Sequence, residues 1–561
     1  MRDDTNALRR HGAVRRAGGL LAGLLLATSC LTPAMAEEWD MGGVKLKLNS
    51  TLSAGMGIRT VNPDSNYIGV SNGGKDPGGV NFDDGNLNYK RGDVYSASVR
   101  MMHEVDVSYQ NLGAFTRFSY FYDFINNDAD STRRTDLTES ARHRSGRGID
   151  LYDAYVFGDF DVGGSPLTVR LGNQVINWGE ALFRTGGIAQ TNAFDVARVV
   201  TPGTNIREAY LPSPMIYANF GVMPGLSIEA YYQFQWRRSK LLPMGTFFST
   251  DDLTGPGAEG LFYAADPGGT GLTPEQLFLL SAGIPKLDDV GPKDQGQFGL
   301  AARYYLDPLS AEISAFYLRY HAKTPYLSAT AVPAPFPVFA APTGYFAYFP
   351  EDIDLYGASV SLPVGPLSVA AEVAYQPDYP VMLADAVTDA ATQAFLTGSP
   401  ATVYGVTPAD RWNAIANAVL SIGPGLGYIG QLPGWIGADT IDVIGEVGAV
   451  SFNGAKPTGV TGDMFAWGTN LATSATYTNA FGSEITLKPG VSIAYDVNGV
   501  AIDRASAGTY VEGRRSLTVG VTGVYRDTLT AAINYTNSTG GGTISRNSDR
   551  DYVTLSASYS F

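Results

Sequence analysis

The stretch that decides the fold is the last ten residues, Tyr552-Val553-Thr554-Leu555-Ser556-Ala557-Ser558-Tyr559-Ser560-Phe561. Apolar residues alternate with hydroxyl-bearing ones along it, and the side chains of a β-strand point alternately to opposite faces. One face of the expected strand is therefore apolar, and the other carries hydroxyl groups. The strand also stops on an aromatic residue at the terminal carboxylate. This ending is typical of the last strand of a membrane β-barrel, and it favours that fold over a soluble strand with the same alternation.

The first 36 residues have the composition of a secretory signal peptide. Arginines at positions 9, 10, 15 and 16 precede an apolar run over 17–26, and Ala34-Met35-Ala36 supplies small residues for cleavage. The apolar run is too short for a membrane-spanning helix. We therefore expect cleavage near Ala36/Glu37 and a mature chain of residues 37–561.

Composition narrows the chemistry and the partners of the mature chain. Cys30 is the only cysteine and lies within the signal, so no disulfide or thiol chemistry is expected. Ala27 stands where a lipoprotein signal has leucine, which makes lipid attachment the less favoured alternative. Removing five arginines and two aspartates from 39 basic and 54 acidic residues leaves 34 and 52, a net charge of −18. Such an acidic chain does not predict nucleic-acid binding and fits loops that meet divalent cations and lipopolysaccharide.

Eighteen stretches of alternating polarity follow one another along the chain. The stretches at 215–222 and 226–237 are joined by Met223-Pro224-Gly225, whose proline and glycine are turn residues. Similar short turns alternate with connections of about 15 to 60 residues, the asymmetry between periplasmic turns and extracellular loops of outer-membrane barrels. We predict an all-β fold, a transmembrane antiparallel β-barrel of 14 to 18 strands with 18 as the best count, and no second domain. The expected strands are 44–59, 94–110, 114–124, 150–159, 167–172, 215–222, 226–237, 297–306, 309–320, 354–362, 367–376, 411–422, 439–449, 467–479, 485–497, 515–525, 528–537 and 551–561.

One long connection is the strongest candidate for a functional site. The roughly 40 residues from Arg170 to Glu208 lack alternation, and connections of this length are usually functional or disordered. Their amides, tryptophan and mixed charges are not a disorder composition. We predict that a segment of about 173–214 folds into the lumen as a constriction; the alternative is an extracellular loop packed on its neighbours. The residues expected to line the constriction are Asn173, Gln174, Asn177, Trp178, Glu180, Arg184, Asn192, Asp195, Arg198, Arg207 and Glu208.

Three other loop segments are more apolar than loops in water usually are. Residues 273–283 and 382–396 predict short helices, and 332–339 is extended and rich in proline. Exposed apolar patches usually mark binding or membrane contact. Two interpretations are equally supported: a hydrophobic mouth that captures lipid-like molecules, and a lid in which the segments pack on one another.

An acidic loop at 81–88, with a weaker companion at 126–130, carries carboxylates and amides at a density that could hold Ca²⁺. The calcium-loop pattern of alternating ligands that closes on glutamate is absent from it. A solvated turn is therefore the favoured interpretation, and no metal site is predicted.

The sequence gives little support for catalysis. The mature chain has three histidines, His103, His143 and His321, and none lies in a recognisable motif. An enzyme inside the barrel would need one of them within hydrogen-bond reach of a carboxylate or serine. We therefore predict that the protein is not an enzyme, with no catalytic residues and no cofactor.

Several motifs together resemble one known family, catalogued as domain of unknown function 1302 (DUF1302), over nearly all of the mature chain. The resemblance implies a proteobacterial outer-membrane barrel, and an export pump of the resistance-nodulation-division type as a partner. It implies no catalytic or binding residues. The motifs are Asp83-Asp84-Gly85-Asn86-Leu87-Asn88, residues 170–180, Tyr210-Leu211-Pro212-Ser213-Pro214-Met215, Phe349-Pro350-Glu351-Asp352-Ile353, Gly445-Glu446-Val447-Gly448 and Asp549-Arg550-Asp551-Tyr552.

Taken together, these observations predict a passive outer-membrane channel or transporter-like barrel for a small hydrophobic or amphipathic molecule. The alternative is a structural or surface-interaction barrel that transports nothing. The expected partners are outer-membrane lipid and lipopolysaccharide, the small ligand, and the barrel-assembly machinery through Phe561.

Overall fold

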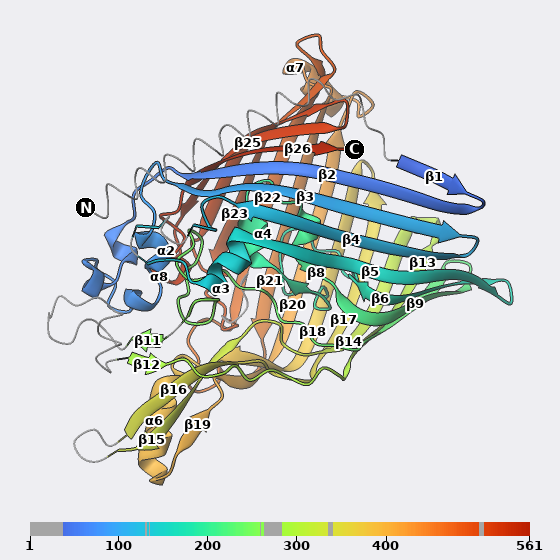
Figure 1. The fold of residues 1–561 in the computed structure, drawn as a ribbon. Coiled ribbons are helices and arrows are strands. Elements are labelled where there is room, and N and C mark those ends of the chain that lie inside the picture. Colours follow the sequence, from blue (N-terminus) through green and yellow to red (C-terminus); the bar gives the residue numbers. More distant parts are fainter. Residues whose placement is uncertain are drawn as a thin grey trace.

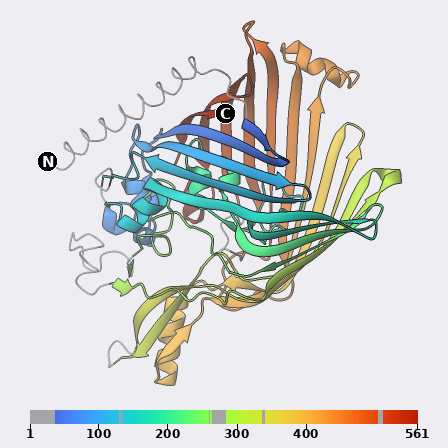
Figure 2. The same cartoon turned by 45° about the vertical axis from the view of Figure 1, so that its right-hand side comes forward.

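The computed structural model describes residues 37–128, 132–133, 135–258, 260–262, 283–334, 340–503 and 510–561. An antiparallel sheet curves round and closes on itself (Figures 1 and 2). Within the described residues, eighteen strands form its wall, and pairing of the first with the last closes it. This closed barrel confirms the predicted fold class and the best strand count.

Each wall strand pairs with the next one along the chain, and each predicted segment overlaps one of them. The wall strands are β2 (Val44–Arg59), β3 (Val94–Tyr109), β4 (Leu112–Asp123), β5 (Arg147–Val162), β6 (Ser165–Gln174), β9 (Ser213–Met223), β10 (Leu226–Gln233), β13 (Gln297–Leu306), β14 (Ala311–Tyr320), β17 (Ile353–Val364), β18 (Leu367–Met382), β20 (Val406–Ile422), β21 (Thr440–Phe452), β22 (Phe465–Ala480), β23 (Ile485–Asn498), β24 (Arg515–Tyr525), β25 (Leu529–Thr539) and β26 (Tyr552–Ser560).

The strands separate polar side chains from apolar ones by their alternation. Along β20, Arg411, Asn413 and Asn417 are buried inside the barrel, whereas Trp412 between them is exposed on the outside. None of the helices within the described residues has the length and apolar composition that a membrane-spanning helix requires. The outer surface of the wall carries exposed apolar side chains, among them Ile149, Leu151, Val156, Leu171, Leu300, Tyr356, Val447, Leu471, Val519 and Ile533.

The strand that closes the barrel shares one edge of β2 with a short strand that the sequence did not predict. β1 (Glu37–Met41) pairs with the first residues of β2, and β26 pairs with Thr51–Arg59. At the junction, the Phe561 N–H donates to the Ser50 carbonyl at 2.8 Å, and the Ser50 N–H donates to the Phe561 carbonyl at 2.7 Å. Phe561 therefore completes the closing seam.

Deleting Phe561 is expected to lower the amount of folded barrel in the outer membrane severalfold, because it removes both hydrogen bonds and the last side chain of the seam. Heat-modifiable migration in gel electrophoresis measures the folded fraction. Phe561→Tyr, which keeps the ring and the backbone bonds, is the control and should assemble normally. Equal amounts of folded wild type and deletion variant would contradict this role.

The two ends of the barrel differ in the length of their connections, as predicted. At one end most strands are joined by a few residues, for example Gly163-Gly164 and Pro224-Gly225. The exception at that end is the connection 423–439, which contains η10 (Ile429–Gln431) and α7 (Leu432–Trp435). Its Tyr428 and Trp435 are 74% and 63% exposed. α7 stands beyond the strand ends in Figure 1.

A small module protrudes from the long-loop end (Figure 1). β15 (Tyr326–Pro333) pairs with β16 (Ala340–Tyr348) and β19 (Ala401–Val403), and helix α6 (Ala386–Thr397) packs on this sheet. α6 starts four residues later than predicted, because β18 continues to Met382. The described apolar segments thus pack on one another, as the lid interpretation expects. Predicted helix 273–283 and residues 335–339 lie outside the described residues, apart from Gly283.

The acidic loop differs from its prediction. Asp83, Asp84, Asn86 and Asn88 are all buried, so the solvated turn was wrong. Loops far apart in sequence cover them.

The other short elements are η2 (Ser65–Tyr67), η3 (Val70–Asn72), η4 (Gly79–Asn81), α2 (Asp84–Leu87), α3 (Glu139–Ala141), η6 (Arg142–Gly146), β7 (Ala193–Phe194), α4 (Val196–Val200), η7 (Ile206–Glu208), β8 (Tyr210–Leu211), β11 (Gly260–Phe262), β12 (Gly283–Pro285), η9 (Asp307–Leu309) and α8 (Gly542–Ser545).

Candidate functional site

The connection 175–212, between the neighbouring strands β6 and β9, reaches the opposite side of the barrel. We call it the lumenal segment. Its contacts include β21, which is reached from β6 through β9, β10, β13, β14, β17, β18 and β20. Eight steps along an 18-strand wall lead almost to the diametrically opposite point. The segment therefore crosses the lumen instead of packing on its neighbours outside.

Two wall glutamates bind the main chain of the lumenal segment. Glu446 of β21 accepts the N–H groups of Leu182, Phe183 and Arg184 at 2.6, 2.9 and 2.6 Å. Glu372 of β18 accepts two more, from residues 180 and 188, at 2.5 and 3.0 Å. Hydrogen bonds to a charged acceptor are the strong class, so these five bonds form a clamp on the far wall.

Arg184 adds a side-chain attachment to this clamp. Its Nη1 donates to Asp496 Oδ1 of β23 at 2.6 Å, and its Nη2 donates to the Thr469 carbonyl of β22 at 2.8 Å. The guanidinium also lies over the Tyr510 ring, 5.1 Å from its centroid. A Cβ at Gly468 would come within 2.8 Å of Nη2, so glycine there leaves the space that the arginine occupies.

Trp178 attaches the start of the segment to another part of the wall. Its Nε1 donates to Glu229 Oε2 of β10 at 2.7 Å. Its ring packs against Tyr231 and Phe316, with centroids 5.1 and 5.7 Å away. A Cβ at Gly299 of the neighbouring strand β13 would lie 2.7 Å from the indole, so the glycine leaves room for Trp178.

The second half of the segment runs along the near wall. Asp195 caps α4 by accepting the Arg198 N–H at 3.2 Å. Arg198 then pairs with Asp150 of β5 at 2.8 Å and lies over the Phe121 ring. Glu208 forms a buried ion pair with Arg100 of β3. Asp195, Arg198 and Glu208 are thus brought together on the side opposite to the far-wall clamp.

The remaining predicted site residues have varied positions. Asn173 and Gln174 belong to β6 itself, where Gln174 donates to the Met215 carbonyl at 3.2 Å. Asn192 exchanges two hydrogen bonds with the main chain of Ile176. Asn177 and Arg207 are exposed, and Arg207 lies 3.8 Å from Glu104. Glu180 donates its N–H to Glu372, and its side chain accepts from Ser359 at 3.3 Å.

Sequence reasoning identified the segment but missed the wall residues that bind it. The sequence places Glu229 and Glu372 only in strands, and Glu446 in a strand and a family motif, yet all three are at least nine-tenths buried. A usable signal was present, since each is an acidic residue within an alternating strand. In a barrel that faces lipid outside, such a residue has to point into the lumen.

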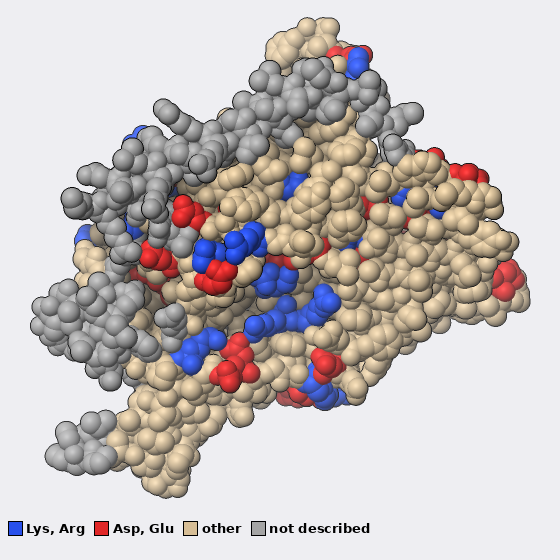
Figure 3. All heavy atoms as spheres, viewed as in Figure 1, with Lys and Arg blue, Asp and Glu red and all other residues tan. Residues whose placement is uncertain are grey.

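A pocket of about 620 Å³ lies among the long loops, next to the second half of the lumenal segment. We call it the mouth pocket. Its lining pairs basic with acidic residues: Lys240 lies 3.3 Å from Asp150, and Arg238 lies 2.7 Å from Asp289. Figure 3 shows Lys and Arg side chains gathered on this face in the region of α3. The charged residues that line the pocket are Arg144, Asp150, Arg238, Lys240, Lys286 and Asp289, and apolar lining comes from Leu241, Pro256, Pro325, Ala347 and Phe349.

The histidines lie outside these sites, except His143, which borders the mouth pocket and is 2.9 Å from exposed Glu139. His103 Nδ1 lies 2.9 Å from Ser50 Oγ, so one histidine does reach a serine. Its ring packs near Phe118 and Tyr120, and in the described part of the chain no carboxylate orients that pair. His321 is buried and bonded to the main chain of residues 295 and 352.

Comparison with known proteins places the chain in a family. Residues 17–561 match the model described as "Protein of unknown function (DUF1302)". The chain belongs to the DUF1302 family. This agrees with the family that the sequence motifs resemble. No curated protein matches the sequence.

Several solved structures match most of this DUF1302 chain at low sequence identity. One similar structure is OccAB2 of Acinetobacter baumannii, with a TM-score of 0.42, 8% identity, and coverage of 92% of this chain and 98% of that one. OpdK of Pseudomonas aeruginosa, solved with vanillate, has a TM-score of 0.40, 11% identity and coverage of 92% and 98%. The outer membrane channel DcaP of A. baumannii has a TM-score of 0.36, 9% identity and coverage of 94% and 100%.

Proposed function

We propose that this protein is a passive outer-membrane channel whose lumenal segment is the constriction. The observation that carries the proposal is the attachment of the segment across the lumen, from β6 and β9 to the glutamates of β18 and β21. A solute that passes through the barrel has to pass beside this segment. The exposed apolar outer wall and the strand closure support a location in lipid, because lipid tolerates neither open sheet edges nor unpaired backbone groups.

The mouth pocket supports a substrate class for this channel. Its lining carries four basic side chains against two acidic ones, in a chain whose overall charge is strongly negative. Apolar side chains such as Leu241 and Phe349 complete the lining. Basic groups beside apolar surface suit a small amphipathic molecule that carries a negative charge.

Planar-bilayer recording with purified protein tests the channel. We expect discrete conductance steps, and a reversal potential in a salt gradient that indicates preference for anions. A folded barrel without conductance would favour the alternative, a structural or surface-interaction barrel.

Neutralising the mouth pocket is expected to weaken the anion preference. In Arg238→Gln/Lys286→Gln, two positive charges are lost from the lining while the lumenal segment keeps its contacts, so the anion-to-cation permeability ratio should fall at least about twofold. Lys456→Gln removes an exposed charge from another loop at the same end and serves as the control. An unchanged ratio in the double variant would show that the pocket does not set selectivity.

A further inference from the structure

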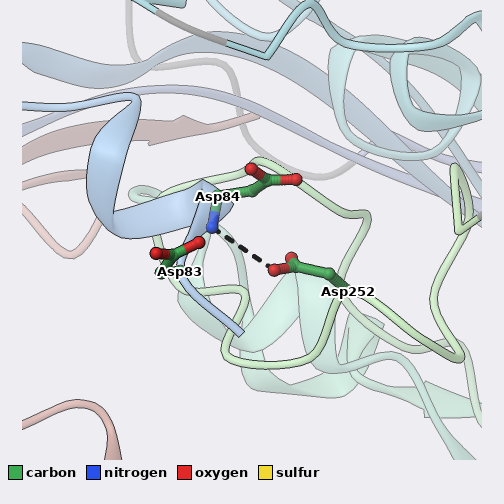
Figure 4. Close-up of side chains that lie close together, drawn as sticks. All are labelled: Asp83, Asp84 and Asp252. Carbon is green, nitrogen blue, oxygen red and sulfur yellow. Dashed lines mark hydrogen bonds between the residues drawn. The ribbon is translucent and has the colours of Figure 1, made fainter. Parts of the chain in front are cut away.

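Three buried carboxylates converge at the long-loop end of the barrel, outside the lumenal segment and the mouth pocket. Asp83 and Asp84 come from the connection between β2 and β3, and Asp252 comes from the connection between β10 and β13. One oxygen from each lies within 4.8 Å of the others. The three residues are 0%, 8% and 5% exposed. Figure 4 shows the three side chains around the start of α2.

Protein groups donate hydrogen bonds to all three carboxylates, but one oxygen of Asp252 receives none from the described residues. Asp83 accepts the Gly69 N–H at 2.8 Å and the Asn72 side-chain amide at 2.9 Å, and Asp84 accepts the Thr135 hydroxyl at 2.9 Å. Asp252 Oδ2 accepts the Asp84 N–H at 3.3 Å, drawn as the dashed line in Figure 4. Asp252 Oδ1 is fully buried, and no group in the described ranges donates a hydrogen bond to it. No described lysine or arginine lies within ion-pair distance of Asp252. The charge of Arg550 acts on it from farther away, and the Nη1 of this arginine donates to the Ser249 carbonyl at 2.7 Å.

An arrangement of this kind is unfavourable without a positive charge. Burying a carboxylate is costly unless it is paired, and like charges at this separation repel one another. Burial, and then the charges of Asp84 and Asp83, raise the pKa of Asp252 well above its ordinary value.

We propose that Asp83, Asp84 and Asp252 bind a Ca²⁺ ion. Calcium is a hard cation that takes carboxylate oxygens at about 2.3–2.6 Å, so two of its ligands can lie up to about 5 Å apart. The oxygens of the cluster lie within that limit. Calcium also tolerates irregular geometry and completes its shell with water or carbonyl oxygens. Coordination by both oxygens of Asp252 also gives Oδ1 the partner that no described protein group supplies.

The ion joins two loops that are separate in sequence. Asp252 lies two residues before Thr254, which lines the mouth pocket together with residues 255–258. Calcium therefore fixes the base of a loop that borders the channel entrance. This site does not depend on transport, and its test measures binding and local exchange only.

The test is hydrogen exchange of the full-length barrel in detergent free of lipopolysaccharide, with either Ca²⁺ or EDTA. In the wild type, Ca²⁺ is expected to slow amide exchange about tenfold or more in peptides covering 81–88 and 247–254. Asp252→Asn keeps the shape of the side chain and removes its charge, so Ca²⁺ should give no protection there. Asp288→Asn removes an exposed carboxylate of the same long loop and should behave like the wild type.

Calorimetric titration with Ca²⁺ supplies a second measurement. We expect one site per barrel in the wild type and at least about tenfold weaker binding in Asp252→Asn. If that variant does not assemble, Asp84→Asn replaces it, with the same expectation. Absence of Ca²⁺-dependent protection in the wild type, or equal protection in the variant, overturns the proposal and leaves a shared proton as the explanation of the cluster.

Discussion

Replacing residues 176–206 with a short flexible linker is expected to increase single-channel conductance severalfold. These residues contain the attachments to both sides of the lumen. Trp178 binds β10, and Arg184 binds β22 and β23. Their removal opens the cross-section that they occupy. The wall glutamates they release, Glu372 and Glu446, become hydrated, so the barrel does not retain buried unpaired charges.

Heat-modifiable migration shows first that the shortened protein is a folded barrel, and planar-bilayer recording then gives its conductance. The matched control replaces residues 384–404, which carry α6 and β19 in the protruding module outside the wall. Removing these should leave conductance near the wild-type value. If conductance and substrate flux stay unchanged when 176–206 are missing, the segment is not a constriction.

The second large effect is expected from Glu372→Gln/Glu446→Gln. A glutamine has to place an NH₂ group where one carboxylate oxygen accepts a main-chain N–H, so at least one bond at each site is lost in either orientation. Hydrogen bonds to charged groups are worth about 1.5–3 kcal/mol each. Loss of several such bonds should free the lumenal segment from the far wall while the barrel stays closed.

Two measurements identify this release. Recordings should show frequent transitions to higher conductance, and added protease should cut the segment faster than in the wild type. Glu484→Gln removes a carboxylate at a short turn, paired with Arg526 and far from the segment, and should change neither result. Identical traces and identical cleavage rates in the double variant would mean that the two glutamates do not hold the segment.

The fold could be predicted because its pattern is local. In a strand with one face in lipid, polar and apolar residues alternate with a period of two. About ten residues of sequence are therefore enough to recognise each wall strand. β1 escaped prediction because its five residues are too few to show this period. The connection 423–439 escaped for a related reason, since its short helical turns have no repeating pattern of their own.

The site could be predicted only in part because its contacts are long-range. Composition marked the lumenal segment, but the bond from the Leu182 N–H to Glu446 joins residues 264 positions apart. The acidic loop shows the same limit: Asp252, which converts it from a surface turn into a buried cluster, lies 168 residues after Asp84. Local sequence indicates that Glu446 points inward but not which segment it binds, and it carries no signal that Asp252 meets Asp84.

The far-wall clamp has a consequence for how such a barrel can change its selectivity. Glu372 and Glu446 bind N–H groups, which every residue except proline carries, whatever its side chain. The side chains of Leu182 and Phe183 remain 51% and 43% exposed beside the clamped main chain. In the proposed channel, the side chains beside the passage can therefore be substituted without loss of the main-chain hydrogen bonds that hold the segment. Selectivity can then change while the attachment to the far wall is kept.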